Sequence, residues 1–246
     1  PSLDWITFVG SGETMLYRGI GWLIAEVKKL TSVPIAVITN GSLFHLPEVR
    51  HELLQADAVL PSLNAGSEAL HQRICRPAEG FTFQQHLAGL QAFRQEYCGR
   101  LWLEVMLLGG INDTDEALHD LAEAIRTINP NMVHLVLPTR PAPEHEVQLP
   151  TNERLERAIA ILSTVATVMN PLKGSMDLRN TPDLLEAISA IVSRHPVQQR
   201  ELHKAIADRY LNDNTQADIV LQELFATGRF QHIEHNGELY WVMESK

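Results

Sequence analysis

The sequence has little cysteine, no long apolar run and fewer basic than acidic residues. Cys75 and Cys98 are its two cysteines, too few and too far apart for a zinc knuckle or a disulfide framework, so we expect reduced thiols. No apolar run approaches the roughly 20 residues that cross a bilayer. The N-terminus has no basic segment leading into an apolar one, which argues against a signal peptide. These absences favour a cytoplasmic protein without a membrane partner.

Charge and length narrow the class further. The 20 Lys and Arg residues stand against 30 Asp and Glu, a formal net charge of −10. Such a balance weighs against bulk attraction to nucleic acid or anionic lipid, so we expect nucleic acid to be an unlikely partner. With 246 residues and 45% hydrophobic content, the chain can bury a sizeable core, as one large domain or a domain with a small appendage.

Apolar runs rich in β-branched residues alternate with segments of helical period over the first two thirds of the chain. This pattern is typical of repeated βα units on a parallel sheet. It predicts an α/β fold with a parallel sheet. The predicted strands are 5–9, 35–39, 58–63, 101–107 and 132–138, and the predicted helices are 19–30, 47–55, 82–97, 114–128 and 151–165.

The composition changes near residue 170. A turn-rich stretch is followed by helical segments at about 183–194, 197–208 and 214–227, and then by a hairpin whose Asn236-Gly237 tip fits a type I′ turn. Three helices and a two-stranded wing predict a winged-helix domain over residues 178–246. The last of these helices has no Lys or Arg, so it is poorly suited to a DNA groove. We expect it to cover the barrel or to contact a peptide or protein.

The first predicted strand runs into the glycine-rich turn "GSGE", residues 10–13. A Walker loop would need a lysine after the second glycine, and a dinucleotide fingerprint would need a third glycine where Met15 stands. Both readings fail. What remains is a turn of small residues with a carboxylate at the end of a strand. In a barrel, the loops after all strands share one face, and that face carries the chemistry.

Five sequence segments in order resemble the radical S-adenosylmethionine (SAM) superfamily, in particular the branch related to the tRNA wybutosine-synthesis enzymes. They cover roughly residues 3–160 and read "TFVGSGETML", "VITNGSLF", "PSLNAGSEALHQRICRP", "LWLEVMLLGGINDTDE" and "LVLPTRPAPE". The resemblance implies an enzyme that cleaves SAM reductively at a four-iron four-sulfur cluster and forms a 5′-deoxyadenosyl radical. It also implies an electron donor such as flavodoxin or ferredoxin. The substrate stays open, with protein, peptide, tRNA or a small molecule as alternatives.

The family's three-cysteine cluster motif, Cys-x-x-x-Cys-x-x-Cys, is absent from this sequence, and Cys75 and Cys98 cannot replace it. In relatives the motif lies upstream of the glycine-rich turn. We therefore expect the chain to be a fragment that lacks the first βα unit and the cluster loop and is inactive by itself, with cluster ligands outside it. The resemblance thus implies a partial TIM-like (β/α) barrel over residues 1–172, whose first strand lies at an open edge. A degenerate homologue that lost the motif is the alternative.

The resemblance also implies a set of SAM-binding residues. Ser62 and Asn64 are two apart on a strand and should face the same side. Glu104 interrupts an apolar strand whose alternation puts the leucines on one face and Glu104 on the other, and a carboxylate facing into the barrel is costly unless it is paired or bound to a ligand. Arg140 could be its partner, a substrate anchor or a solvated loop residue. The full predicted set is Gly10, Ser11, Gly12, Glu13, Asn40, Ser62, Asn64, Glu104, Val136 and Arg140.

Other polar groups predict less. Asn40 fits a turn role as well as a ligand contact, and Thr14 stands where the family has a proline. The segment "PEHE" at 143–146 and the pair His232 and His235 are expected to be surface residues without a metal. A function of another class also remains open, namely a non-catalytic ligand-binding barrel whose winged helix is a regulatory or nucleic-acid-binding module.

Overall fold

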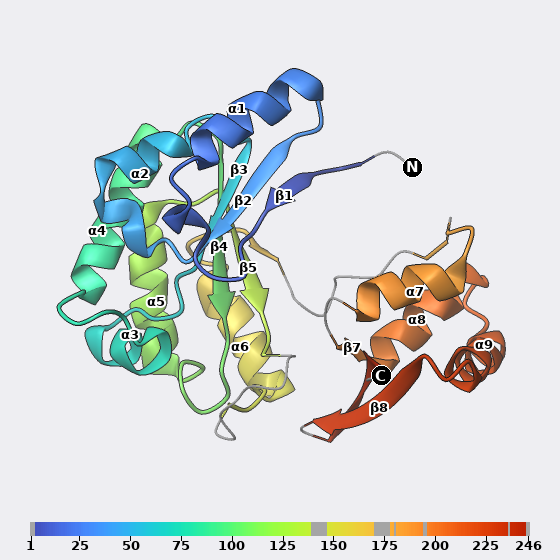
Figure 1. Ribbon diagram of the computed structural model, residues 1–246. Helices are drawn as coiled ribbons and strands as arrows, with labels where there is room; N and C mark the ends of the chain where they lie inside the picture. The colour runs from blue at the N-terminus through green and yellow to red at the C-terminus, as the bar shows by residue number, and fades with distance from the viewer. Residues whose placement is uncertain are drawn as a thin grey trace. The chain divides into compact units, whose positions relative to one another are not determined.

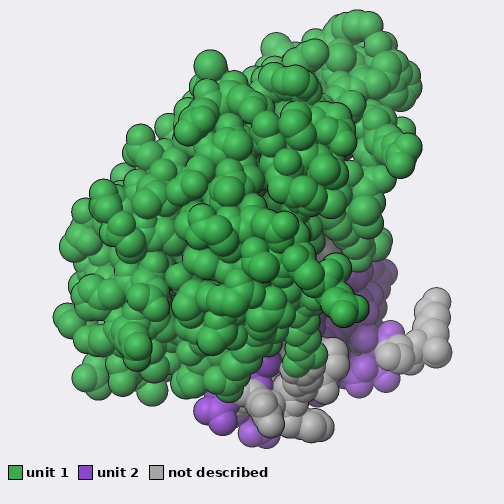
Figure 2. All heavy atoms as spheres, turned by 90° about the vertical axis from the view of Figure 1, so that its left-hand side faces the viewer, with its two compact units in different colours: residues 1–137, 149–171 green, residues 138–148, 172–246 purple. Residues whose placement is uncertain are grey.

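The structure is a computed structural model that describes residues 3–138, 147–169, 178–179, 181–193, 196–235 and 237–244. The chain divides into two compact units, one of residues 1–137 and 149–171 and the other of residues 138–148 and 172–246, coloured separately in Figure 2. Among the residues described, no helix is long and apolar enough to cross a membrane.

A parallel sheet is the centre of the first unit. Its strands pair in the order in which they occur along the chain, and every pair is parallel. The strands are β1 (Ile6–Phe8), β2 (Ile35–Thr39), β3 (Ala58–Pro61), β4 (Arg100–Met106), β5 (Met132–Val136) and β6 (Val168–Met169).

The helices α1, α2, α4 and α5 lie on the same side of this sheet (Figure 1). Crossovers of one hand between sequential parallel strands place all connections on one side, which is the arrangement of a barrel rather than of a doubly wound sheet. The helical elements are η1 (Thr14–Leu16), α1 (Ile20–Leu30), η2 (Ser42–His45), α2 (Pro47–Glu52), α3 (Glu68–Cys75), α4 (Phe83–Glu96), α5 (Asp115–Ile128) and α6 (Asn152–Leu162).

N-cap residues mark the starts of three of these helices, at the positions where the predicted helix ranges begin. The Thr82 hydroxyl accepts a hydrogen bond from the Gln85 backbone amide, and the Gln85 side-chain oxygen accepts one from the Thr82 backbone amide, which together form a capping box. Thr114 and Thr151 cap α5 and α6 in the same way. Asn129, in the left-handed conformation at φ 55°, ends α5.

The predicted partial barrel corresponds to a mixed α/β unit with a parallel sheet, and the five predicted strands all occur. The prediction of five strands was nevertheless wrong by one, because the short strand β6 pairs with β5 just before the turn-rich stretch. α3 was also not predicted, and α2 ends at Glu52 rather than at residue 55. β1 lies at an edge of the sheet, as expected.

The two faces of β4 show how the sheet sorts its side chains. Leu101, Leu103 and Val105 are fully buried against the helices, in the core that α4, α5 and α6 complete. Trp102, Glu104 and Met106 are half-buried on the opposite face. This alternation confirms the prediction that Glu104 lies apart from the leucine face.

The second unit has its own core around Ile188, Leu202, Val220 and Trp241. It contains the three expected helices and the expected hairpin, but the antiparallel sheet has a third strand, β7, paired with β9. Gly237, at φ 75°, supplies the positive φ of the hairpin tip, and Asn236 lies outside the described residues. Its elements are α7 (Leu184–Val192), β7 (Val197–Gln198), α8 (Gln199–Arg209), α9 (Asn214–Ala226), β8 (Phe230–His235) and β9 (Glu238–Met243).

Candidate functional site

The predicted turn at residues 10–13 follows β1 and is tied to the end of β2 by one carboxylate. Glu13 accepts hydrogen bonds from the Met15 amide at 2.9 Å, from the Asn40 amide at 2.7 Å and from the Thr39 hydroxyl. The Thr14 hydroxyl accepts a further one from the Gly10 amide at 3.1 Å. Glu13 therefore uses its oxygens to fix the turn, which leaves the backbone of Gly10 to Gly12 exposed as the part available to a ligand.

Glu13→Gln is expected to lower the free energy of unfolding by about 1–2 kcal/mol. Charge-assisted hydrogen bonds to a carboxylate are stronger than neutral ones, and the side-chain NH2 of the glutamine would face the chain's donor groups in place of an accepting oxygen. Hydrogen exchange of the Met15 and Asn40 amides should become faster. Glu26→Gln on α1, where the carboxylate forms a surface ion pair with Lys29 and does not contact the turn, is the matched control. Unchanged exchange at both amides would contradict the anchoring role.

Asn40 serves the turn after β2. Its side-chain oxygen accepts from the Ser42 amide at 2.8 Å. Gly41 follows at φ 72°, and a Cβ there would lie 3.2 Å from Cβ of Pro61 and 3.3 Å from Nε2 of His86. Both the conformation and the close approach require glycine, so the turn role expected for Asn-Gly is present.

Ser62 and Asn64 follow β3, and they differ in how many of their side-chain polar atoms form hydrogen bonds within the described chain. The Asn64 side-chain oxygen accepts from the Met106 amide at 2.9 Å. The Ser62 hydroxyl and the Asn64 amide nitrogen make no hydrogen bond to the part of the chain that the structure describes. Together with Asn40, both residues line one cleft with a volume of about 530 Å³. Three of the predicted residues thus meet in one hollow.

A polar row crosses the open face of the sheet at this level. Ser62 is bridged to Glu104 in parallel register, and Glu104 lies opposite His134 on β5. Thr39 pairs with Pro61, which places Asn40 beside Ser62 at the start of the same row. The row therefore runs from the end of β2 to β5 and contains three of the predicted residues and one that was not predicted.

Burial sets the ionisation of this row. It raises the pKa of Glu104 and lowers the pKa of His134, in both cases by favouring the neutral form. Nε2 of His134 is buried without a hydrogen-bond partner among the described residues, and its ring lies 5.6 Å from that of Trp102. The signal for His134 was the same as for Glu104, a polar residue that interrupts an alternating strand.

Asn112, which the sequence did not single out, holds the loop after β4 in place. Its side chain is buried, with 1% of its surface exposed. It accepts from the Leu108 amide at 2.7 Å and donates to the carbonyls of Asn64 and Met106, both at 2.9 Å. The sequence signal for this residue was the segment Gly-Gly-Ile-Asn-Asp. Its asparagine connects the loop after β4 with the loop after β3.

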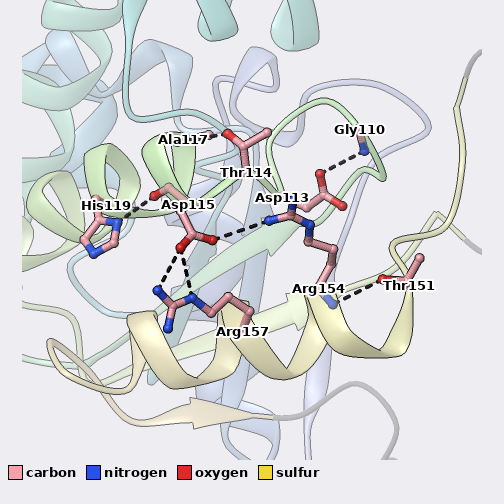
Figure 3. Close-up of polar contacts among 9 residues, drawn as sticks. All are labelled: Gly110, Asp113, Thr114, Asp115, Ala117, His119, Thr151, Arg154 and Arg157. Atoms are coloured by element: carbon pink, nitrogen blue, oxygen red, sulfur yellow. Dashed lines mark hydrogen bonds and ion pairs between the residues drawn. The ribbon is translucent and has the colours of Figure 1, made fainter.

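The same loop is anchored to the start of α5, as Figure 3 shows. Asp113 accepts from the Gly110 amide at 2.8 Å, and Gly110 itself has φ 70°. Asp115 forms ion pairs with Arg154 at 3.4 Å and with Arg157 at 2.7 Å, both from α6. These contacts hold α5 against α6 and so fix the base of the site loop.

The structure describes one of the two remaining predicted positions, Val136, but not Arg140. The Val136 carbonyl accepts from the Leu107 amide at 2.9 Å, which joins the ends of β4 and β5. Arg140 and the segment 143–146 lie outside the described residues. Contacts within the described chain thus connect Glu13 with Asn40, Ser62 with Glu104, and Asn64 with Asn112.

A metal cluster does not fit the described residues. Cys75 and Cys98 are free and exposed. The described chain has no group of three or more His, Cys, Asp or Glu side chains that could hold a metal ion. The described side chains therefore do not form a metal-binding site by themselves.

Comparison with known proteins gives one family and several relatives. The family described as the radical SAM superfamily matches residues 5–125. A protein named GTPase Obg from Brachyspira hyodysenteriae is 32% identical over 249 residues, covering 98% of this chain and 35% of that protein. A probable dual-specificity RNA methyltransferase RlmN from Thermosynechococcus vestitus is 28% identical over 169 residues, covering 65% of this chain and 48% of that protein.

Among solved structures, a radical SAM methyltransferase from Sphaerobacter thermophilus aligns with a TM-score of 0.55. It is 24% identical, and the alignment covers 69% of this chain and 51% of that one. At this identity the likeness concerns the fold. The chain spans about half or less of the length of these three proteins.

Proposed function

We propose that this chain, which belongs to the radical SAM superfamily through residues 5–125, binds S-adenosylmethionine along the carboxyl ends of β1 to β5. Members of this superfamily use SAM together with a four-iron four-sulfur cluster. The observation that carries the proposal is a pair of donors, on Ser62 and Asn64, that have no hydrogen-bond partner among the described residues and lie in a cleft beside Glu104.

The chemistry of these groups fits SAM. SAM carries a positive sulfonium, an ammonium, a carboxylate, two ribose hydroxyls and an adenine. The hydroxyl of Ser62 and the amide nitrogen of Asn64 can donate to a carboxylate or to ribose oxygens. Glu104 is available for the positive end, where binding would favour its charged form against the effect of burial. A Cβ on Gly12 would meet nothing within 4 Å, so the turn backbone is open to a ligand.

The whole protein is, on this proposal, a radical SAM enzyme. Beside a reduced cluster, SAM supplies a 5′-deoxyadenosyl radical that abstracts a hydrogen from a substrate, and the barrel orients the reactants and excludes water. On this proposal the described residues of this chain bind and orient SAM, and they do not themselves supply the ligands of the cluster.

Binding can be measured on this chain without any turnover. We expect S-adenosylhomocysteine, a SAM analogue with the same adenosyl and amino acid groups, to bind by isothermal titration calorimetry. Ser62→Ala and Asn64→Asp should each weaken it at least tenfold, about 1.4 kcal/mol. Asn64→Asp keeps the oxygen that accepts from Met106 and removes the donor. An Asp side chain in place of Asn64 also repels the ligand's carboxylate.

The matched controls are Ser163→Ala at the exposed end of α6 and Asn214→Asp at the exposed start of α9. Neither residue lines the cleft. Equal affinity of the wild type and both site variants, with all proteins folded, would refute the assigned binding site.

The substrate class requires a correction. The net charge predicted that nucleic acid would be an unlikely partner, and the relatives named as RNA methyltransferases do not support that exclusion. Overall charge says little about a local surface, since it averages over both units. RNA therefore belongs among the substrate classes to be tested, beside proteins, peptides and small molecules.

For the second unit we propose a winged helix. The support is three helices beside a three-stranded antiparallel sheet with a hairpin formed by β8 and β9. α9 exposes Ile219 and Phe225 and has no basic residue. Such a surface favours a protein partner for this helix over a nucleic acid groove.

A further inference from the structure

The cleft of about 530 Å³ extends from the strand ends into a region beyond Asn40, Ser62 and Asn64. Its outer wall is formed by α3, the segment that follows it, the start of α4, and η2. His71 and His86 face each other there, with ring centroids 5.3 Å apart. Both residues are buried, with 3% and 4% of their surface exposed.

These two histidines are unusual because three of their four ring nitrogens are buried without a hydrogen-bond partner in the described part of the chain. Nε2 of His71 and both nitrogens of His86 are buried and make no hydrogen bond of normal geometry to the described residues. Buried polar atoms in folded proteins are nearly always hydrogen-bonded. Two such side chains that line the same cleft therefore indicate a ligand that supplies the missing partners.

Both rings are neutral at physiological pH. Burial lowers the pKa of His86 to about 4, and His71 beside it acts in the same direction, while the Asn40 backbone opposes the shift too weakly to reverse it. Burial also lowers the pKa of His71, against the opposing effect of Glu68. A neutral imidazole offers one donor and one acceptor. The pair can thus match a ligand edge that alternates acceptor and donor.

The cleft also suits a flat ring. The Phe81 ring lies 6.2 Å from both histidine rings, and the His45 ring lies 5.5 Å from Phe81. Among the described residues that line the cleft, none is acidic and the basic one is Arg76. Its volume is within the range of small-molecule pockets, which are mainly apolar with a few placed polar groups.

We propose that this outer part of the cleft binds the purine ring of a ligand, stacked near Phe81 and hydrogen-bonded at its edge by His71 and His86. A purine presents adjacent acceptor and donor groups, as adenine does with N7 and its N6 amino group. Stacking on an aromatic side chain is a general way to hold such a base. A metal ion fits less well, because the described residues contain no three-ligand group.

Two ligands could bring a purine to this position. One is the adenosyl group of SAM, in which case the inference rests on the proposed function. The other is a purine nucleoside of the substrate. The purine is common to both, and the source is decided by the experiment.

The experiment titrates the intact chain with adenosine, guanosine, uridine and S-adenosylhomocysteine. The variants are His71→Phe and His86→Leu, which remove the ring nitrogens, and Ala78→Trp, which fills the cleft from an exposed position and so does not endanger the fold. The control is His119→Phe on the exposed side of α5. Thermal unfolding checks that each variant is folded.

We expect the wild type to bind a purine ligand more tightly than uridine, and all three variants to weaken it at least tenfold while the control does not. Weakened adenosine or guanosine with unchanged S-adenosylhomocysteine would support the proposal with the substrate as the source. Weakened S-adenosylhomocysteine without binding of free nucleosides would support it with SAM as the source.

The proposal is overturned if no probe binds, if uridine binds as tightly as the purines, or if Ala78→Trp leaves every affinity within twofold. Its failure differs from failure of the proposed SAM site. S-adenosylhomocysteine that responds to Ser62→Ala but not to the cleft variants would refute this inference alone. Adenosine that responds to the cleft variants, without any binding of S-adenosylhomocysteine, would refute the SAM site alone.

Discussion

Asn112→Asp is expected to lower the free energy of unfolding by about 3–5 kcal/mol. The new side chain keeps an oxygen for the Leu108 amide but turns a double donor toward the carbonyls of Asn64 and Met106 into an acceptor. A buried carboxylate without a partner is strongly destabilising, and even a protonated one can satisfy a single carbonyl. Urea unfolding, with hydrogen exchange of the β4 amides as the readout for the first unit, measures the change.

The same substitution should also weaken binding of S-adenosylhomocysteine, because Asn112 holds the backbone of Asn64 beside the cleft. Asn214→Asp makes the same chemical change at an exposed helix start and serves as the control. A loss of less than about 1 kcal/mol would show that the loop finds other partners and that Asn112 does not organise it.

Acid is expected to destabilise the first unit by about 3 kcal/mol between pH 7 and pH 4 through His86. Burial lowers the pKa of His86 in the folded protein to about 4, whereas an exposed histidine titrates near 6.5. Between these values the unfolded chain binds the proton first, so stability is complete above about pH 6.5 and falls as the pH decreases toward 4. His71 shifts in the same direction and adds to the loss.

Urea unfolding midpoints at pH 4.5, 5.5 and 7 test this, a range that avoids most of the titration of the paired carboxylates Asp57, Asp115 and Glu96. His86→Leu should flatten the dependence, since it removes the titrating group. His119→Gln, at an exposed position, should leave it as in the wild type. The same slope in wild type and His86→Leu would place the acid sensitivity elsewhere.

Local sequence signals were sufficient for most of the fold. The alternation through β4 placed Glu104 apart from the leucine face, and three of the predicted helix ranges begin at the threonines that cap these helices, Thr82, Thr114 and Thr151. Three of the predicted polar strand-end residues, Asn40, Ser62 and Asn64, line one cleft, and Glu13 of the glycine-rich turn contacts the Asn40 amide. These features depend on residues within one turn or one strand, which is why the pattern contains them.

Features that depend on distant residues were not predictable in this way. β6 is a two-residue strand defined by its pairing with β5, and α3 is short with an N-cap, Ser67, that makes no capping hydrogen bond. The roles of Asn64 and Asn112 come from loops that meet only in the folded unit. His71 and His86 occupy two helices, and their shared burial has no local signature.

The order of the strands in the sheet has a consequence for how the first unit folds during synthesis. Each strand after β1 pairs with the strand that precedes it along the chain, as Ile35 does with Ile6 and Met132 with Trp102. During synthesis, every completed strand and helix can dock on an edge that already exists. The sheet can therefore grow from the N-terminal side while translation continues, and the loops after β3 and β4 meet before the last strand leaves the ribosome.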